Sequence, residues 1–299
     1  MPKKTTSKKS SSKKALVTGG AGFLGRHIIN QLIENGYKVI AYDLSKPESL
    51  PPNVEFVKGD VLNLEKLKKA TKGCDYFFHC AAIADIETTR QKPIETMQVN
   101  VVGTANCLEA AKSANIKRFM FSSSVYASSK RGSFYRISKQ AGEELCKEYE
   151  KKGLNYTIMR YGSLYGRGTN DWNFVHKVCR DLLEKGEFIY YGSGEELREF
   201  INIEDAARES IRVAEKEEFS DKTVLITGHQ RMRMKDFFEL IAEIVTKDVK
   251  IQYKKNTHEH YKITPYTFDE NLPVRINMSR YIDVGEGILA CLEEVNKNS

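Results

Sequence analysis

Apolar residues along the chain fall into short continuous runs, and most of these runs are followed by a longer stretch with helical periodicity. The short runs, which are typical of buried strands, occupy 14–18, 37–42, 54–58, 75–80, 118–122 and 156–161. The helical stretches occupy 23–35, 64–71, 93–114 and 138–152. Strands that alternate with helices at this spacing indicate βαβ units. The sequence therefore predicts an α/β protein with a doubly wound parallel sheet of the Rossmann type.

The second half of the chain is less regular. It predicts helices at 174–184, 203–214, 234–246 and 285–295, with strands at 223–227 and 249–253. Little periodicity is seen over 254–280, and no Pro/Gly-rich linker separates the two halves, so we expect them to interleave. The expected division is a leader (1–13), a Rossmann domain (14–162, with contributions from about 196–228) and a smaller α/β part (163–299).

Composition narrows the class of protein. With 299 residues, of which 40% are hydrophobic and 29% charged, the chain is typical of a globular protein, and no apolar run is long enough to span a membrane. The net charge of +7 suggests a nucleic-acid partner, but the first 14 residues hold six lysines and no acid, which leaves +1 for the rest. We therefore expect no nucleic-acid partner. The leader is interpreted as a solvated segment, with an electrostatic tether as the alternative.

Six cysteines are spread along the chain without a CxxC pair or the spacing of a zinc site, so no metal is expected. His258 and His260 flank Glu259, but no third ligand is evident, and a polar loop is the preferred interpretation. Because the N-terminal residues contain no apolar signal segment, we expect a reducing, cytoplasmic location.

The glycine-rich turn after the first predicted strand is the strongest local signal. Gly19 permits a tight turn, Gly22 lets the backbone approach a pyrophosphate, and Gly25 allows close packing of helix on strand. The N–H groups that open the following helix, at Phe23 and Leu24, face such an anion. The pattern predicts a dinucleotide-binding turn.

Asp43 ends the second predicted strand, where a carboxylate accepts hydrogen bonds from the adenosine ribose hydroxyls. A 2′-phosphate would be repelled there, so NAD is favoured over NADP. Arg26 and Lys46 are the residues that could reverse this preference, and a turn-capping role is the alternative for Asp43.

With these motifs, the chain resembles an extended short-chain dehydrogenase/reductase of the NAD-dependent epimerase/dehydratase kind. The matching stretches are GGAGFLG (19–25), GD (59–60), HCAA (79–82), NVVGT (100–104), FSSS (121–124), YRISK (135–139), RYGSLYG (160–166) and REFINIEDAA (198–207). The resemblance implies that Asp60 and Val61 hold the adenine and that Ala81 and Ala82 lie beside the nicotinamide ribose. It also places Asn100 and Ser122 among the cofactor contacts.

Tyr135 and Lys139 are one helical turn apart, so both project from the same face of a helix. A nearby ammonium lowers the pKa of a phenol, which would let Tyr135 take a proton from a substrate hydroxyl while hydride leaves for the nicotinamide. A surface pair without function is the alternative. The family also places a serine on the substrate oxygen. Counting from the preceding strand favours Ser124, whereas counting back from Val125 selects Ser122.

Departures from the family pattern narrow the chemistry. Ser124 and Tyr135 are only 11 residues apart, a shorter segment than is usual in the family's epimerases, which predicts a more open pocket or an unusual sugar. Dehydratases of the family carry an Asp-Glu pair after the catalytic hydroxyl, and its absence here disfavours a 4,6-dehydratase. Ser163, Asn173 and Arg198 are candidate substrate contacts, the last as a clamp for a diphosphate.

The sequence thus predicts an NAD-dependent sugar-nucleotide epimerase or a closely related oxidoreductase. The alternatives are a reductase or dehydrogenase of a non-nucleotide substrate and a non-catalytic dinucleotide sensor. The resemblance also implies a homodimer in which helices near 94–114 and 138–152 pair between subunits.

Overall fold

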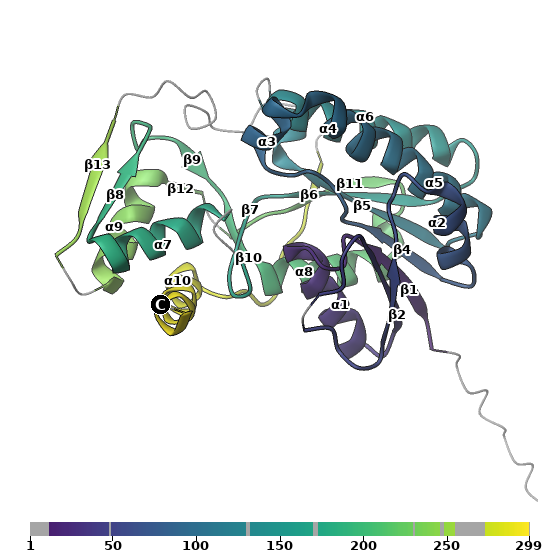
Figure 1. Ribbon diagram of the computed structural model, residues 1–299, viewed down its shortest axis with the longest axis horizontal. Coiled ribbons are helices and arrows are strands. Elements are labelled where there is room, and N and C mark those ends of the chain that lie inside the picture. The colour runs from purple at the N-terminus through teal and green to yellow at the C-terminus, as the bar shows by residue number, and fades with distance from the viewer. Residues whose placement is uncertain are drawn as a thin grey trace, which may run out of the picture.

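A single parallel sheet of eight strands organises the computed structural model, which describes residues 12–47, 49–129, 132–169, 173–229, 231–245, 248–254 and 273–298 (Figure 1). The strand order is β14-β11-β6-β5-β4-β1-β2-β3, and every neighbouring pair is parallel. The strands are β1 (Lys14–Thr18), β2 (Lys38–Asp43), β3 (Val54–Lys58), β4 (Tyr76–His79), β5 (Arg118–Ser124), β6 (Tyr156–Tyr161), β11 (Lys222–Ile226) and β14 (Val274–Arg275). The predicted doubly wound parallel sheet is confirmed.

Helices cover both faces of this sheet, which explains why its strands are continuously apolar. Figure 1 shows α1 (Phe23–Glu34) and α8 (Ile203–Glu215) on one side, with α2 (Leu64–Thr71), α5 (Gly103–Ser113) and α6 (Ser133–Glu150) on the other. Successive side chains of a strand point to opposite faces. Accordingly, Val17 packs in the core under α1 and α8, while Leu16 packs in the core on the other side.

A smaller lobe follows β6. Three helices, α7 (Phe174–Lys185), α9 (Met234–Val245) and α10 (Val284–Asn298), form its core with β8 (Glu187–Tyr190), which pairs in parallel with β13 (Lys250–Tyr253). Short pairs link the lobe to the sheet: β7 (Ser163–Tyr165) with β10 (Phe200–Asn202), and β9 (Leu197–Arg198) with β12 (Met232–Arg233). In Figure 1 this lobe lies beside the carboxyl ends of the large sheet's strands.

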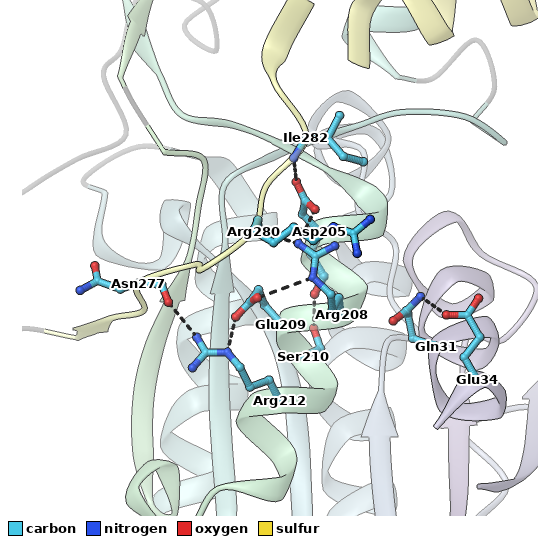
Figure 2. A network of polar contacts seen from close by, with 11 residues as sticks. Gln31, Glu34, Asp205, Arg208, Glu209, Ser210, Arg212, Asn277, Arg280 and Ile282 are labelled. Atoms are coloured by element: carbon cyan, nitrogen blue, oxygen red, sulfur yellow. Dashed lines mark hydrogen bonds and ion pairs between the residues drawn. The ribbon is translucent and has the colours of Figure 1, made fainter. Parts of the chain in front are cut away.

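The chain returns from the lobe to the large sheet twice, through β11 and β14, and the segment after β14 is fastened along α8 (Figure 2). Asp205 accepts a hydrogen bond from the Ile282 amide at 2.6 Å, and the Arg208 guanidinium donates to the Arg280 carbonyl at 2.7 Å. The helix that carries Asp205, α8, was predicted over 203–214. Asp205 lies in the first turn, while Asn202 caps the helix by accepting from the Glu204 amide.

Several elements differ from the sequence prediction. The helix expected over 93–114 is divided into α4 (Pro93–Met97), the π-helical segment η1 (Gln98–Val102) and α5, and it is preceded by an unexpected short helix, α3 (Ile86–Gln91). Helix α6 begins at Ser133 rather than at 138, because its first turn packs under the loop that follows β5. Within the described ranges, no helix is both long and apolar enough to cross a bilayer.

Candidate active site

The turn between β1 and α1 has the close backbone contacts that its glycines predict. Gly19 has a φ of +69°, a conformation that favours glycine, and a Cβ there would lie 2.7 Å from the Ala81 nitrogen. A Cβ on Gly25 would collide with the Gly19 carbonyl oxygen, and the Gly22 amide donates to that same oxygen at 3.0 Å. The backbone can therefore form this turn only if Gly19 and Gly25 carry no side chains.

Asp43 ends β2 beside this turn. One carboxylate oxygen accepts from the Ala21 amide at 2.9 Å and the other from the Ser45 amide at 3.4 Å, which holds the group at the place expected for a ribose. The Arg26 guanidinium donates to the Gly168 carbonyl, so this segment already binds it. The arrangement favours NAD, as predicted, because this potential partner for a 2′-phosphate points elsewhere.

The other expected cofactor residues follow the ends of neighbouring strands. Asp60 and Val61 follow β3, and Ala81 and Ala82 follow β4. All four lie at the carboxyl edge of the sheet, where open α/β sheets bind their ligands. Asn100 is 3% exposed, and its amide bonds both backbone groups of Ile83 and the Ser138 hydroxyl. Its side chain therefore braces the loop after β4.

Tyr135, Lys139 and Ser124 come together where α6 meets the end of β5. Ser124 and the Tyr135 hydroxyl share a hydrogen bond, and Lys139 Nζ lies 5.7 Å from the centroid of the Tyr135 ring. The Lys139 ammonium donates to the Ser122 carbonyl at 2.7 Å. The structure thus brings the three predicted catalytic residues together.

The expected lowering of the tyrosine pKa is wrong for this state of the protein. Burial raises the pKa of Tyr135 to about 12, against the smaller opposite effect of the Ser124 hydrogen bond. Burial also lowers the pKa of Lys139 to about 8. Desolvation disfavours a charge on either group and dominates here.

The three consecutive serines have different partners. The Ser122 hydroxyl donates to the Cys80 thiol at 3.4 Å, and the Ser123 hydroxyl donates to the buried Glu143 carboxylate at 2.5 Å. Ser124 is the one that bonds Tyr135 and lines the cavity in front of it. This geometry supports Ser124 in the alternative left open by the sequence.

A cavity of about 610 Å³ opens in front of Ser124 and Tyr135, within the range typical of ligand pockets. The three predicted substrate residues, Ser163, Asn173 and Arg198, also line it. Arg198 is 6% exposed, with one guanidinium nitrogen 3.0 Å from its neighbour's carbonyl. A buried arginine in the wall of such a cavity is suited to bind an anion.

Asn173 occupies the N-cap of α7. Its side-chain oxygen accepts from the Val175 and His176 amides, and its nitrogen donates to the Leu164 carbonyl at 2.7 Å. These bonds hold the start of α7 at the cavity.

Sequence reasoning missed part of this wall. Tyr126 lies two residues after Ser124, and burial raises its pKa while the Arg198 charge opposes that rise. Asp85 and Thr88 line the cavity from α3, an element that was not predicted. The sequence signal that could have identified Tyr126 is its position just after the strand that ends at Ser124.

Metal binding finds no support among the described residues, which contain no cluster of three or more potential His, Cys, Asp or Glu ligands. His258, Glu259 and His260 lie outside the described residues. All six cysteines are free.

Comparison with known proteins agrees with this geometry. The model of the NAD dependent epimerase/dehydratase family matches residues 15–227. The chain belongs to this family. Membership of the NAD-dependent epimerase/dehydratase family makes the protein an enzyme that uses NAD, and the glycine turn and Asp43 fit that cofactor.

Relatives and solved structures resemble the chain over nearly its whole length. It is 27% identical to a putative UDP-glucose 4-epimerase of Methanocaldococcus jannaschii, over 95% of this chain and 99% of the relative. It is 29% identical to the UDP-N-acetyl-alpha-D-glucosaminuronate decarboxylase of Bacillus cytotoxicus, over 86% and 87%. Among structures, the UDP-glucose 4-epimerase of Thermotoga maritima with UDP-glucose is 25% identical, with a TM-score of 0.80 over 95% of this chain and 99% of that one.

Proposed function

We propose that the protein is a sugar-nucleotide epimerase that oxidises a sugar carbon and then reduces it from the opposite face. The observation that carries the proposal is that Ser124 and Tyr135 line a cavity that the buried Arg198 also lines, with Lys139 beside the Tyr135 ring. A guanidinium in the cavity wall is better suited to an anionic substrate than to an uncharged one. Relatives that act on UDP-sugars support a nucleotide diphosphate as the anion.

The residues divide the work as follows. NAD, when bound, would accept a hydride from the sugar carbon and would return that hydride in the reduction step. Tyr135 accepts the hydroxyl proton at its phenolic oxygen during oxidation and gives it back during reduction. Ser124 hydrogen-bonds that same substrate oxygen and orients the tyrosine. Lys139 provides a positive charge beside the ring, which favours the phenolate against the effect of burial.

The cofactor site in this proposal is made by the residues at the carboxyl edge of the sheet. They are Gly19, Gly22, Phe23, Leu24, Gly25, Asp43, Asp60, Val61, Ala81, Ala82, Ser122, Tyr135 and Lys139, with Asn100 acting behind them through its bonds to Ile83. Arg198 binds the substrate diphosphate, and Ser163 and Asn173 line the sugar side of the cavity.

Dehydration is not supported by the site. The residue after Ser124 is the buried Val125, and the cavity carboxylate, Asp85, accepts from both the amide and the hydroxyl of Thr88. Asp85 is the one carboxylate among the described lining residues of the cavity, and its Oδ1 atom caps α3.

A homodimer and a cytoplasmic location complete the proposal. Ile94, Val102 and Ile137 are 73%, 52% and 42% exposed on the neighbouring segments α4, η1 and α6. Apolar side chains grouped in this way favour an interface between two copies. Six free thiols favour a reducing compartment. Light scattering on the purified protein and on the Ile94→Lys variant tests the dimer, and a monomeric wild type refutes it.

The decisive experiment combines Tyr135→Phe with native mass spectrometry and assays on UDP-glucose, UDP-N-acetylglucosamine and UDP-glucuronic acid. Tyr135→Phe should retain NAD but lose turnover by about 10²-fold or more, since proton transfer by a placed side chain contributes that much. Tyr149→Phe, on the same helix but bonded to Glu109 instead, is the matched control with unchanged turnover. Full turnover in Tyr135→Phe would exclude the assigned role. Net accumulation of NADH instead of an epimer would identify a dehydrogenase.

A further inference from the structure

A continuous series of buried hydrogen bonds runs behind the active site from the end of β1 to the start of α6. Thr18 Oγ1 lies 2.7 Å from His79 Nδ1, and His79 Nε2 lies 2.9 Å from Thr104 Oγ1. Thr104 donates to the Asn100 carbonyl at 2.6 Å, and the Asn100 side chain donates to the Ser138 hydroxyl at 3.0 Å. None of these five residues is more than 3% exposed.

The donor order in this series can be assigned from its ends. A carbonyl oxygen only accepts, so the single proton of the Thr104 hydroxyl goes to Asn100, and Thr104 must accept from His79. The His79 ring therefore carries its proton on Nε2, and Nδ1 accepts from the Thr18 hydroxyl. Burial, together with the Lys139 charge, lowers the pKa of His79 to about 3, which agrees with a neutral ring.

Both ends of the series touch the site. Thr18 precedes Gly19, and its hydroxyl oxygen also lies 3.5 Å from the Ala81 amide, so it contacts the loops expected to hold the cofactor. At the other end, the Ser138 hydroxyl donates to the Tyr135 carbonyl at 2.8 Å, and Ser138 precedes Lys139. The series therefore connects the dinucleotide-binding turn to the first turn of the helix that carries the catalytic pair.

We propose that His79 is a positioning residue, which acts through Thr18 and Thr104 to hold the cofactor loops in a fixed position relative to α6. The relay, as we call Thr18, His79, Thr104, Asn100 and Ser138, is neutral, so it fixes geometry without adding charge beside Lys139. Each member is buried, and removing one leaves its neighbour without a partner in a place that water does not reach. The part of the proposal that concerns α6 rests on the proposed catalytic roles of Tyr135 and Lys139.

The first test uses the wild-type protein. Nitrogen NMR of protein labelled with ¹⁵N-histidine should show His79 with a proton on Nε2 and none on Nδ1, unchanged between pH 5.5 and pH 8.5. A ring with its proton on Nδ1, or a ring that titrates in this range, would overturn the donor order and with it the relay.

The second test measures NAD affinity by calorimetry, without any sugar substrate. Thr18→Val keeps the shape but removes the hydroxyl, and should weaken NAD binding about tenfold, a typical consequence of leaving one buried group unpaired. Thr18→Ser restores the hydroxyl and should bind NAD like the wild type. Thr71→Val removes another fully buried hydroxyl, bonded to the Leu67 carbonyl away from the site, and should also bind normally. Wild-type affinity in folded Thr18→Val would refute the proposal.

The coupling between the two ends of the relay decides whether it acts as a unit. If it does, Thr18→Val combined with Ser138→Ala should weaken NAD binding no more than Thr18→Val alone. Effects that multiply would show two independent local contacts and overturn the relay. Because NAD affinity is the readout, the outcome is separate from the test of the proposed function, which measures the turnover of sugar nucleotides.

Discussion

Removing the charge of Glu143 tests how much the buried ion pair on α6 contributes to the stability of the protein. Glu143 lies one turn after Lys139 on α6 and is 4% exposed. Its carboxylate accepts from Arg160 Nε at 2.9 Å, from a second Arg160 nitrogen at 2.7 Å and from the Ser123 hydroxyl. Arg160 in turn donates to the Ser128 hydroxyl at 2.6 Å, so the pair ties α6 and β6 to the turn that follows Ser124.

The expected cost follows from this burial. Glu143→Gln leaves the Arg160 guanidinium, itself 8% exposed, without its counter-ion, and the new amide N–H₂ group turns a donor toward other donors. Breaking a buried ion pair on one side typically costs about 3–5 kcal/mol of unfolding free energy. Removing both charges in Glu143→Leu/Arg160→Met avoids the unpaired ion, so this double variant should be more stable than Glu143→Gln.

Urea unfolding followed by circular dichroism measures these differences. Glu144→Gln is the matched control, because Glu144 is the next residue on the same helix, is exposed and pairs with Lys147 at the surface. It should change the unfolding free energy by less than about 0.5 kcal/mol. A loss below about 1 kcal/mol in Glu143→Gln would refute the argument, since it would mean that Arg160 finds water or another partner.

Three further outcomes follow from the site. Gly25→Ala places a Cβ against the Gly19 carbonyl oxygen and should weaken NAD binding about tenfold or more by calorimetry, whereas unchanged affinity would show that the turn can move. Asp43→Ala should reduce the preference for NAD over NADP about tenfold, and an unchanged ratio would exclude the ribose role. Burial lowers the pKa of Lys139 from 10.5 to about 8, so the unfolded chain binds more protons between these values. The unfolding free energy of the wild type, relative to Lys139→Met, should therefore rise from pH 8 to pH 10, and a flat difference would contradict the burial.

The sequence predicted the large sheet well because its strands are buried on both faces. In a strand such as β1 the three central residues, Ala15, Leu16 and Val17, are all apolar and fully buried, and that pattern needs no knowledge of distant residues. The glycine turn was equally local, because Gly19 and Gly25 meet within one turn of backbone. The catalytic pair needed only the period of a helix to be placed on one face.

Features that depend on distant contacts were missed. β14 is two residues long and exposed, so its strand character comes from pairing with β11 and not from its own composition. The π-helical segment carries Asn100, whose amide bonds Ile83 and Ser138 from two other parts of the chain. A count along the strand left Ser122 and Ser124 open, because the choice depends on which hydroxyl meets a tyrosine on another element.

Charge was the least informative sequence feature, and the structure explains why. The excess of positive charge belongs to the leader, whereas the two cations of the proposed site, Lys139 and Arg198, are buried. A buried cation contributes little to a surface pattern but acts strongly on a ligand, because the surrounding dielectric is low. Burial lowers the pKa of Lys139, Cys80 and Glu143 oppose that effect, and the neutral His79 adds no second positive charge. The charge that acts on a ligand in the proposed site therefore depends on individual buried groups such as Lys139 and His79, and the net charge of the chain does not reveal it.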